Sequence, residues 1–263
     1  MTFTFYKYQG TGNDFVIIDN RQNILSKNNT KLFKRLCDRK FGVGADGLML
    51  LEEPMNAEDD FTMVYFNADG NESSMCGNGG RCLVAFASFL GVVKDTATFT
   101  AIDGKHEATI EEGRVCLQMI DVEQIENHET HLFLDTGSPH HVTMVDAIQE
   151  VDVSKMGKEI RNGAPYFEKG TNVNFVQKKA DNEFLVRTYE RGVEDETLSC
   201  GTGVTAVALA MHYMGVADQN KISITTPGGE LQVVFEKNDS GYKKVFLIGP
   251  AEQVFKGEFT WKH

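Results

Sequence analysis

Short runs of apolar residues, separated by polar turns and glycines, dominate the first half of the chain and predict a β-rich fold. Their lengths and their β-branched or aromatic content are typical of strands. We expect strands at residues 3–8, 14–19, 46–52, 62–67, 96–101, 106–110 and 115–119. One segment differs, because residues 30–41 place apolar side chains at 32, 33, 36 and 37 and are followed by Gly42. That spacing predicts a helix that ends at a glycine.

The second half repeats this order of elements. We expect a helix at residues 151–161, before Gly163, and strands at 131–135, 141–145, 172–177, 183–190, 222–226, 231–235 and 244–248. A repeated order of elements indicates an internal duplication. The boundary is placed in the polar segment 121–130, which gives an N-terminal half, 1–120, and a C-terminal half, 121–251. The last segment, 252–263, is surplus to the second half, and we expect it to join the sheet of the first.

One stretch occurs once in each half. Cys76 and Cys200 are each followed by Gly-x-Gly and an apolar segment, and a further glycine lies fifteen residues after each cysteine. Residues 83–90 and 204–211 are apolar nearly all round, and a helix without a polar face is normally buried. The predicted fold is therefore α+β, with two pseudo-symmetric β-rich halves that each curl a mixed sheet around a central helix. We expect the active site in the cleft between the halves.

Paired cysteines at helix starts favour one kind of chemistry. A helix N-terminus offers unpaired N–H groups and a positive dipole end, which bind anions and can lower a cysteine pKa from about 8.5 to roughly 3.5–7.5. Two acid/base groups on opposite faces of a carbon can invert it, one removing a proton as thiolate while the other donates one as thiol. Such a reaction needs neither pyridoxal phosphate nor a metal, and no motif for a cofactor is found.

The composition of the chain limits which partners and which cellular compartment can be expected. Lys plus Arg number 26 against 38 Asp plus Glu, and the net charge of −12 disfavours nucleic acid and anionic membrane surfaces. No apolar run of membrane-spanning length and no secretion signal occurs at the N-terminus, so we expect a cytoplasmic protein. Five scattered cysteines indicate free thiols, and Cys37, Cys82 and Cys116 are interpreted as inert core residues.

Seven motifs together resemble the diaminopimelate epimerase family. They lie in order along nearly the whole chain, at residues 10–15, 42–48, 66–82, 137–142, 170–175, 189–203 and 227–231. The resemblance implies a cofactor-independent isomerase that interconverts LL- and meso-diaminopimelate in lysine and peptidoglycan precursor biosynthesis. A homodimer is kept as the expected assembly.

The resemblance also implies roles for single residues. Cys76 and Cys200 would be the catalytic pair, and His140 and Glu190 would tune their ionisation. The remaining predicted substrate-binding residues are Asn13, Asn67, Gly77, Asn78, Ser138, Asn172, Glu190, Arg191, Gly201 and Thr202. Among these, Gly77, Asn78, Gly201 and Thr202 would hold the reacting carboxylate. Asn13, Asn67, Asn172 and Arg191 would hold the distal amino-acid end.

The chain departs from the family pattern at three places. Ser138 stands where many members have Asn, and Gly47 stands where Gln is frequent, so one distal contact would be shortened and another lost. The segment 193–197 is one residue longer than usual and places additional carboxylates near the second thiol. We expect these carboxylates either to raise the pKa of that thiol or to face solvent.

Other functions remain open at this stage. A proline racemase-like enzyme would share the fold but act on another amino acid, and a non-catalytic amino-acid-binding protein would have no need of two thiols. A dinucleotide site at residues 42–47 is disfavoured, because its Gly-x-Gly-x-x-Gly pattern follows a predicted helix and precedes a strand. A metal site at Cys76, Cys82 and His140 is disfavoured by the spacing of the cysteines.

Overall fold

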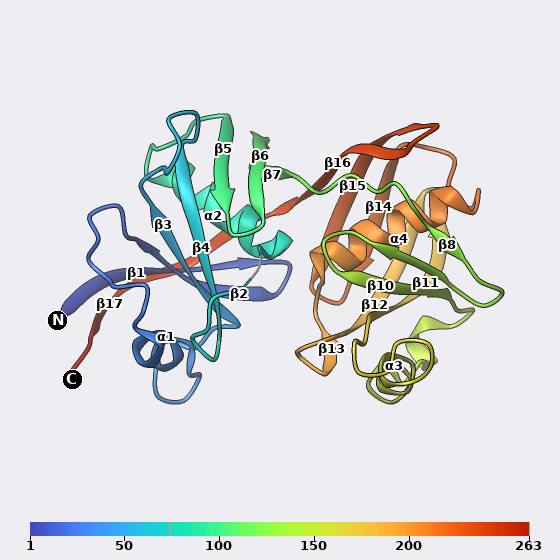
Figure 1. Cartoon of the computed structure of the whole chain (residues 1–263), viewed down its shortest axis with the longest axis horizontal. Coiled ribbons are helices and arrows are strands. Elements are labelled where there is room, and N and C mark those ends of the chain that lie inside the picture. The colour runs from blue at the N-terminus through green and yellow to red at the C-terminus, as the bar shows by residue number, and fades with distance from the viewer. Residues whose placement is uncertain (74, 263) are drawn as a thin grey trace. The chain divides into compact units, whose positions relative to one another are not determined.

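A computed structural model describes residues 1–73 and 75–262 and divides the chain into two compact units. The first unit holds residues 1–117 and the C-terminal segment from Pro250, and the second holds residues 118–249. Figure 1 shows the elements of both, coloured along the chain. The fold is mostly β, with few helices and mixed sheets, as the sequence predicts. Every helix in the described residues is too short or too polar to cross a membrane.

The described residues of the first unit form two helices and eight strands. They are α1 (Thr30–Cys37), α2 (Gly77–Phe89), β1 (Thr2–Gly10), β2 (Asn13–Asp19), β3 (Gly47–Glu52), β4 (Phe61–Asn67), β5 (Thr96–Ala101), β6 (Gly104–Glu111), β7 (Arg114–Gln118) and β17 (Glu252–Thr260). The final strand, β17, pairs antiparallel with β1.

The second unit has two α-helices, one 3₁₀ turn and nine strands among its described residues. They are α3 (Val153–Asn162), α4 (Gly201–Tyr213), η1 (Ile148–Glu150), β8 (Glu126–Asn127), β9 (Leu132–Asp135), β10 (Pro139–Met144), β11 (Asn172–Ala180), β12 (Glu183–Glu190), β13 (Asp195–Thr197), β14 (Lys221–Thr226), β15 (Gly229–Asn238) and β16 (Gly241–Pro250).

The strands of the two units pair in the same sequence of directions. From β1 to β7, successive neighbours are antiparallel, parallel, antiparallel, parallel, antiparallel and antiparallel. The series β9, β10, β11, β12, β14, β15 and β16 runs through the same order. The helices that follow Cys76 and Cys200 occupy equivalent places in the sequence. In each unit the helix connects the two strands of the second parallel pair, which are β4 and β5 for α2, and β12 and β14 for α4.

Side chains alternate between the two faces of a strand, so each unit can pack one helix against each face of its strands. Leu48 and Leu50 of β3 join a core cluster with Leu32 and Phe33 of α1. Side chains of a strand alternate between its faces, so the intervening Met49 lies on the opposite face, where its Sδ is 3.2 Å from the position of a Cβ on Gly79 of α2. All six residues of β3 are buried as a result.

The second unit uses the same alternation at β11. Val173 and Phe175 form a core cluster with Val153 of α3 and Tyr189 of β12. Asn174 lies on the other face, toward α4, where a Cβ on Gly203 would be 2.5 Å from its Oδ1. This face of β11 therefore carries polar side chains to the start of α4.

The predicted helix at 30–41 is shorter in the structure. α1 ends at Cys37 because Asp38 takes an extended conformation, with φ −66° and ψ 118°. The Asp38 carboxylate accepts hydrogen bonds from the backbone N–H groups of Lys40 and Phe41, each at 2.8 Å. Such local side-chain bonds compete with helical ones, so the helix stops before its apolar spacing does.

Candidate active site

Cys76 is the N-cap residue of α2. Its backbone is extended, with φ −98° and ψ 127°, and the helix begins at Gly77. The thiol therefore lies at the end of the helix where N–H groups lack intrahelical acceptors and where the helix dipole favours negative charge. Gly77 and Asn78, predicted to bind the substrate carboxylate, form the first turn and are buried.

Asn13, at the start of β2, contacts this helix start. Its Oδ1 lies 3.5 Å from the Cys76 Sγ and 3.4 Å from the Asn78 Nδ2. Its Nδ2 donates to Asp46 Oδ2 at 2.7 Å. Asn13, Cys76 and Asn78, all predicted as site residues from the sequence, thus belong to one hydrogen-bond network of the first unit.

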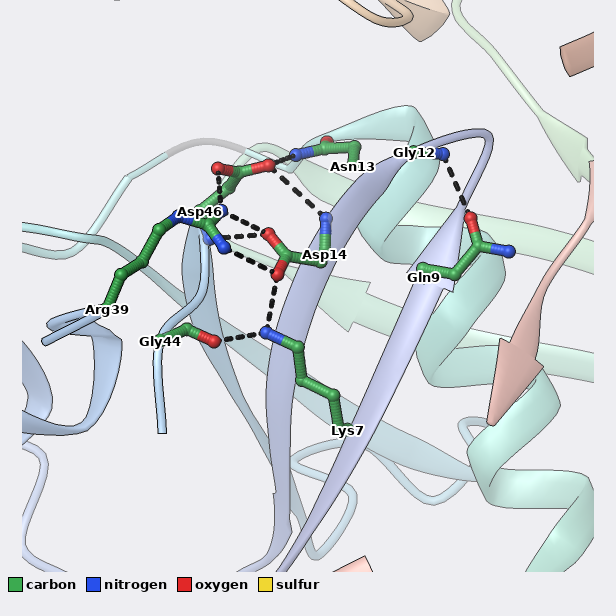
Figure 2. Close-up of polar contacts among 8 residues, drawn as sticks. All are labelled: Lys7, Gln9, Gly12, Asn13, Asp14, Arg39, Gly44 and Asp46. Carbon is green, nitrogen blue, oxygen red and sulfur yellow. Dashed lines mark hydrogen bonds and ion pairs between the residues drawn. The ribbon is translucent and has the colours of Figure 1, made fainter. Parts of the chain in front are cut away.

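A charged network holds Asp46 behind Asn13 (Figure 2). Arg39 donates to both Asp14 oxygens, at 3.0 and 2.6 Å, and to Asp46 Oδ1 at 2.7 Å. Lys7 contacts Asp14 at 2.6 Å and also donates to the Gly44 carbonyl. Burial opposes ionisation of Asp14, but the hydrogen bonds and charges of Arg39 and Lys7 outweigh it and hold its pKa at about 2.

Arg81 brings a buried positive charge to α2. The side chain has no exposed surface, and its Nη1 donates to the Gly77 carbonyl at 3.2 Å. Burial lowers the pKa of Arg81 to about 10, while the charges of Cys82 and Cys76 act in the opposite direction. The guanidinium is therefore close enough to Cys76 to favour a thiolate there.

Cys200 has the same position at the second helix. It is the N-cap of α4, with φ −117° and ψ 112°, and Gly201 and Thr202 form the first turn. Its Sγ lies 3.4 Å from Thr202 Oγ1, and Thr202 Oγ1 lies 2.9 Å from His140 Nε2. His140 is fully buried in β10.

Asn174 and Thr188 complete this second network. Asn174 Nδ2 lies 3.0 Å from His140 Nδ1 and donates to the His141 carbonyl at 3.1 Å, and its Oδ1 accepts from Thr188 Oγ1 at 3.0 Å. Burial, together with the charge of Arg191, lowers the pKa of His140 to about 3. The imidazole is therefore neutral at physiological pH.

Asn172 and Arg191, two of the residues predicted to bind the distal end, lie with Glu190 at the ends of β11 and β12. Asn172 Oδ1 accepts from the Arg191 N–H at 2.9 Å, and its Nδ2 donates to the Pro139 carbonyl at 3.1 Å. Arg191 Nη1 donates to the Lys169 carbonyl at 3.1 Å. Glu190 Oε2 accepts from Thr197 Oγ1 at 3.1 Å. Asn172 thus fixes the backbone of Arg191, and the half-buried Ser138 lies next to Pro139.

The acidic segment 193–197 is held by specific partners. Glu194 binds Arg161 at 3.0 Å, Glu196 binds Arg187 through two bonds of 2.6 Å, and Asp195 accepts from Ser154. Residues 195–197 form β13, a strand that was not predicted from the sequence and that pairs with β12. These contacts direct the carboxylates to α3 and to β12.

Asn67 and Gly47 lie opposite each other in β4 and β3. Asn67 is exposed at the strand end. A Cβ on Gly47 would lie 2.5 Å from Cε2 of Tyr65, so the Tyr65 ring fills the space next to this backbone. A longer side chain at position 47 would require that ring to move.

The other cysteines differ from the pair at the helix starts. Burial raises the pKa of Cys37 and of Cys82 to about 12, and it also raises that of Cys116. In residues 1–73 and 75–262, no group of three His, Cys, Asp or Glu side chains is arranged to hold a metal ion.

Asp46, Asn174 and Thr188 are site residues that the sequence analysis missed. Asn174 had a usable signal, since it is two positions from Asn172 on a predicted strand and so shares its face. Asp46 had a weaker one, because its contact with Asn13 spans 33 residues of sequence.

Comparison with known proteins gives the family. The sequence model of diaminopimelate epimerase matches residues 5–122 and 132–254. The chain belongs to the diaminopimelate epimerase family. A diaminopimelate epimerase of Flavobacterium psychrophilum is 54% identical to it over 95% of this chain and 98% of the relative. One from Aquifex aeolicus is 39% identical over 97% of both chains.

Solved structures of more distant proteins share the fold. A phenazine biosynthesis protein of the PhzF family from Bacillus anthracis superposes with a TM-score of 0.80 over 99% of this chain and 100% of its own, at 12% identity. A hydroxyproline epimerase from Agrobacterium vitis gives 0.69 over 98% and 91%, at 13% identity. At such identities the likeness concerns the fold alone.

Proposed function

We propose that this protein interconverts LL- and meso-diaminopimelate, in lysine and peptidoglycan precursor biosynthesis, with Cys76 and Cys200 as its acid/base pair. The observation that carries the proposal is that both thiols are N-cap residues of buried helices with the same backbone conformation. Membership of the diaminopimelate epimerase family supports the substrate.

In each turnover, one cysteine removes the α-proton as a thiolate. The other, as a thiol, donates its proton to the opposite face of the same carbon, so the configuration inverts and the number of protons is unchanged. The N–H groups at the two helix starts, with Gly77, Asn78, Gly201 and Thr202, bind the reacting carboxylate and stabilise the charge that develops in the carbanion. No redox step is needed.

The distal amino-acid end is recognised by polar groups in both units. Arg191 offers a guanidinium to the carboxylate, and Glu190 offers a carboxylate to the ammonium group. Asn13, Asn67, Ser138 and Asn172 add amide and hydroxyl contacts. Asn172 supports this role through the bond that it accepts from the Arg191 backbone.

His140 and Glu190 act on the thiols as positioning groups. His140 is neutral and bonded to Thr202, which in turn contacts Cys200. Glu190 is oriented by Thr197.

The test is incubation with LL-diaminopimelate in deuterium oxide, followed by measurement of α-deuterium and stereochemistry. The wild-type protein is expected to form the meso isomer with deuterium at one α-carbon. Cys76→Ser and Cys200→Ser should each lower the rate by roughly 10²–10⁴-fold, because each removes one acid/base group.

Cys116→Ser is the matched control, since this half-buried thiol lies within strand β7 and not at the N-terminus of a helix. It should retain wild-type activity. Absence of exchange in the wild type, or full activity in either active-site variant, would refute the two-thiol mechanism. Exchange of proline without exchange of diaminopimelate would identify a proline racemase-like enzyme instead.

A cytoplasmic location, a homodimer and the division into halves at residues 120 and 251 stay predictions from the sequence.

A further inference from the structure

The amide of Asn13 has a fixed orientation. Its Nδ2 faces Asp46 Oδ2 at 2.7 Å, and an ionised carboxylate can only accept a hydrogen bond. The Oδ1 must therefore face Cys76, where it too can only accept. At this contact Cys76 is the donor, which means that the bond forms with its thiol and is lost with its thiolate.

Asp46 cannot easily release this amide. Its second oxygen accepts from Arg39, and Arg39 is in turn held by both oxygens of Asp14. Figure 2 shows the four side chains in one network, with Lys7 on the far side of Asp14. Asp46 also accepts from the Asp14 N–H at 3.3 Å.

The hydrogen-bond directions around Cys200 follow from the His141 carbonyl. The His141 carbonyl only accepts, so the group of Asn174 that faces it must be the Nδ2 amine. That amine also faces His140 Nδ1, which is therefore unprotonated. The ring proton of neutral His140 lies on Nε2 and is donated to Thr202 Oγ1.

Thr202 then has one hydrogen left to donate. Its oxygen accepts from His140, and Cys200 Sγ lies 3.4 Å away, a contact in which either atom could be the donor. A hydroxyl that donates to sulfur stabilises the thiolate. Cys76 thus faces an oxygen that can only accept, whereas Cys200 faces a hydroxyl that is able to donate.

We propose that Asp46 and Asn174 are positioning residues that give the two thiols opposite hydrogen-bond roles, with Cys76 held as the donor and Cys200 as the acceptor. These contacts favour Cys200 as the base and Cys76 as the acid. The proposal rests on the proposed function only in taking these thiols as the catalytic pair.

Charged groups around the thiols act in addition to these contacts. Near Cys76, the Arg81 charge favours the thiolate and so opposes the Asn13 contact, while Asp103 accepts a bond from the Met75 backbone. Near Cys200, His140 is neutral and Arg191 is close enough to affect that imidazole. These groups do not change in the variants below. Asp46→Asn also removes one negative charge, which lowers the Cys76 pKa in the same direction as the inverted hydrogen bond. Asn13→Ala changes no charge and is measured beside it to separate the two effects.

Asp46→Asn should invert the first contact. The Arg39 charge attracts the remaining oxygen of the new amide, which turns its NH₂ toward Asn13. Asn13 then rotates to accept from it and presents its own N–H to Cys76. The pH midpoint for alkylation of Cys76 should fall by about one unit, a tenfold gain in thiolate.

Thr202→Val should have the opposite effect at the second thiol. It keeps the shape of the side chain and removes the donor, so the alkylation midpoint of Cys200 should rise by about one unit. Thr202→Ser retains the hydroxyl and should keep the wild-type midpoint. A purely structural role for residue 202 does not predict this difference between Val and Ser.

The measurement is the rate of iodoacetamide labelling of each cysteine against pH, read by peptide mass spectrometry on the full chain. Cys37 and Cys82 serve as internal references, because burial raises the pKa of both to about 12. Asp19→Asn is the matched control for Asp46→Asn, since it breaks another aspartate–arginine pair, with Arg21, at the other end of β2. It should leave Cys76 labelling unchanged.

If Asp46→Asn does not fold, Asn13→Ala alone tests the contact, because loss of the accepting oxygen should lower the Cys76 midpoint in the same direction. An unchanged or raised midpoint for Cys76, or an unchanged or lowered one for Cys200 in Thr202→Val, would overturn the proposal. Because labelling needs no substrate, its result is separate from that of the deuterium experiment, and either can fail alone.

Discussion

Two buried imidazoles, His140 and His141, should make the second unit sensitive to mild acid. Both have a pKa of about 3 in the folded chain, against about 6.5 for an unfolded histidine. Between these values the unfolded chain binds more protons than the folded one, so the free energy of unfolding must fall as the pH falls.

The cause of the low pKa at His141 is visible in its contacts. Burial is the main cause, and the nearby His131 adds to it. The His141 ring stacks on His131 with centroids 4.0 Å apart, and its Nδ1 lies 2.9 Å from the Tyr166 hydroxyl. Burial raises the pKa of Tyr166 to about 12, so this hydroxyl stays protonated and can donate to the ring.

The magnitude follows from the two pKa values. For one such histidine, lowering the pH from about 7 to about 5 changes the free energy of unfolding by about 2 kcal/mol. The two together remove about 4 kcal/mol, a large part of the 5–15 kcal/mol typical of a folded domain. The pKa of Asp14 is held at about 2, so this residue changes the free energy of unfolding only below about pH 4 and not between pH 7 and 5.

Urea unfolding followed by circular dichroism at about pH 7, 6 and 5 measures this loss. His141→Phe keeps an aromatic ring against His131 and removes the titrating group, so it should lose about 2 kcal/mol less than the wild type over the same range. His128→Gln is the control, because His128 is exposed. Equal losses in His141→Phe and the wild type would refute the assignment of acid sensitivity to His141.

Two further predictions concern the elements that support the ends of β12. Arg187→Met should lower the free energy of unfolding by roughly 2 kcal/mol, because it leaves the Glu196 carboxylate and two backbone carbonyls without their donor. Arg21→Met, which breaks a more exposed local pair, should cost less than about 1 kcal/mol, and equal losses in urea unfolding would contradict the argument. Gly157→Ala should destabilise by roughly 1–3 kcal/mol in the same assay, because the new methyl would lie 2.3 Å from Tyr189 Cβ; a gain, as expected for alanine in an open helix, would show that Tyr189 can move.

Most elements of the fold could be predicted from the sequence because their periodicities are strong. The strand at 183–190 has the predicted bounds in the structure, and the helices after Cys76 and Cys200 are buried as their apolar composition predicts. Helix α1 was predicted too long because the periodicity continues past Asp38, whose carboxylate ends the helix. Strands β8 and β13 have only two and three residues, too few to show any period.

The site could be predicted only in part, because its partners depend on long-range contacts. Cys76 and Cys200 are visible as a repeated pattern in the sequence. Asp46 is not, since its role arises from the register of β2 and β3, which brings residues 13 and 46 together. Asn174 could have been found from its spacing to Asn172, whereas its bond to His140 depends on the parallel pairing of β10 and β11.

The two thiols differ because one scaffold supplies different chemistry at equivalent places. In both units a parallel strand pair, β2 with β3 and β10 with β11, carries the side chains that reach the helix start. In the first unit Asn13 of β2 presents an amide oxygen to Cys76. In the second unit His140 of β10 bonds Thr202 of α4, whose hydroxyl lies 3.4 Å from the Cys200 sulfur. Inversion by two bases requires one thiolate and one thiol at the same moment, and identical surroundings would give both sulfurs the same tendency to ionise. Unequal neighbours on a repeated scaffold remove that equality, so a chain in which both thiols faced hydroxyl donors should hold the productive single-thiolate state for a smaller fraction of the time.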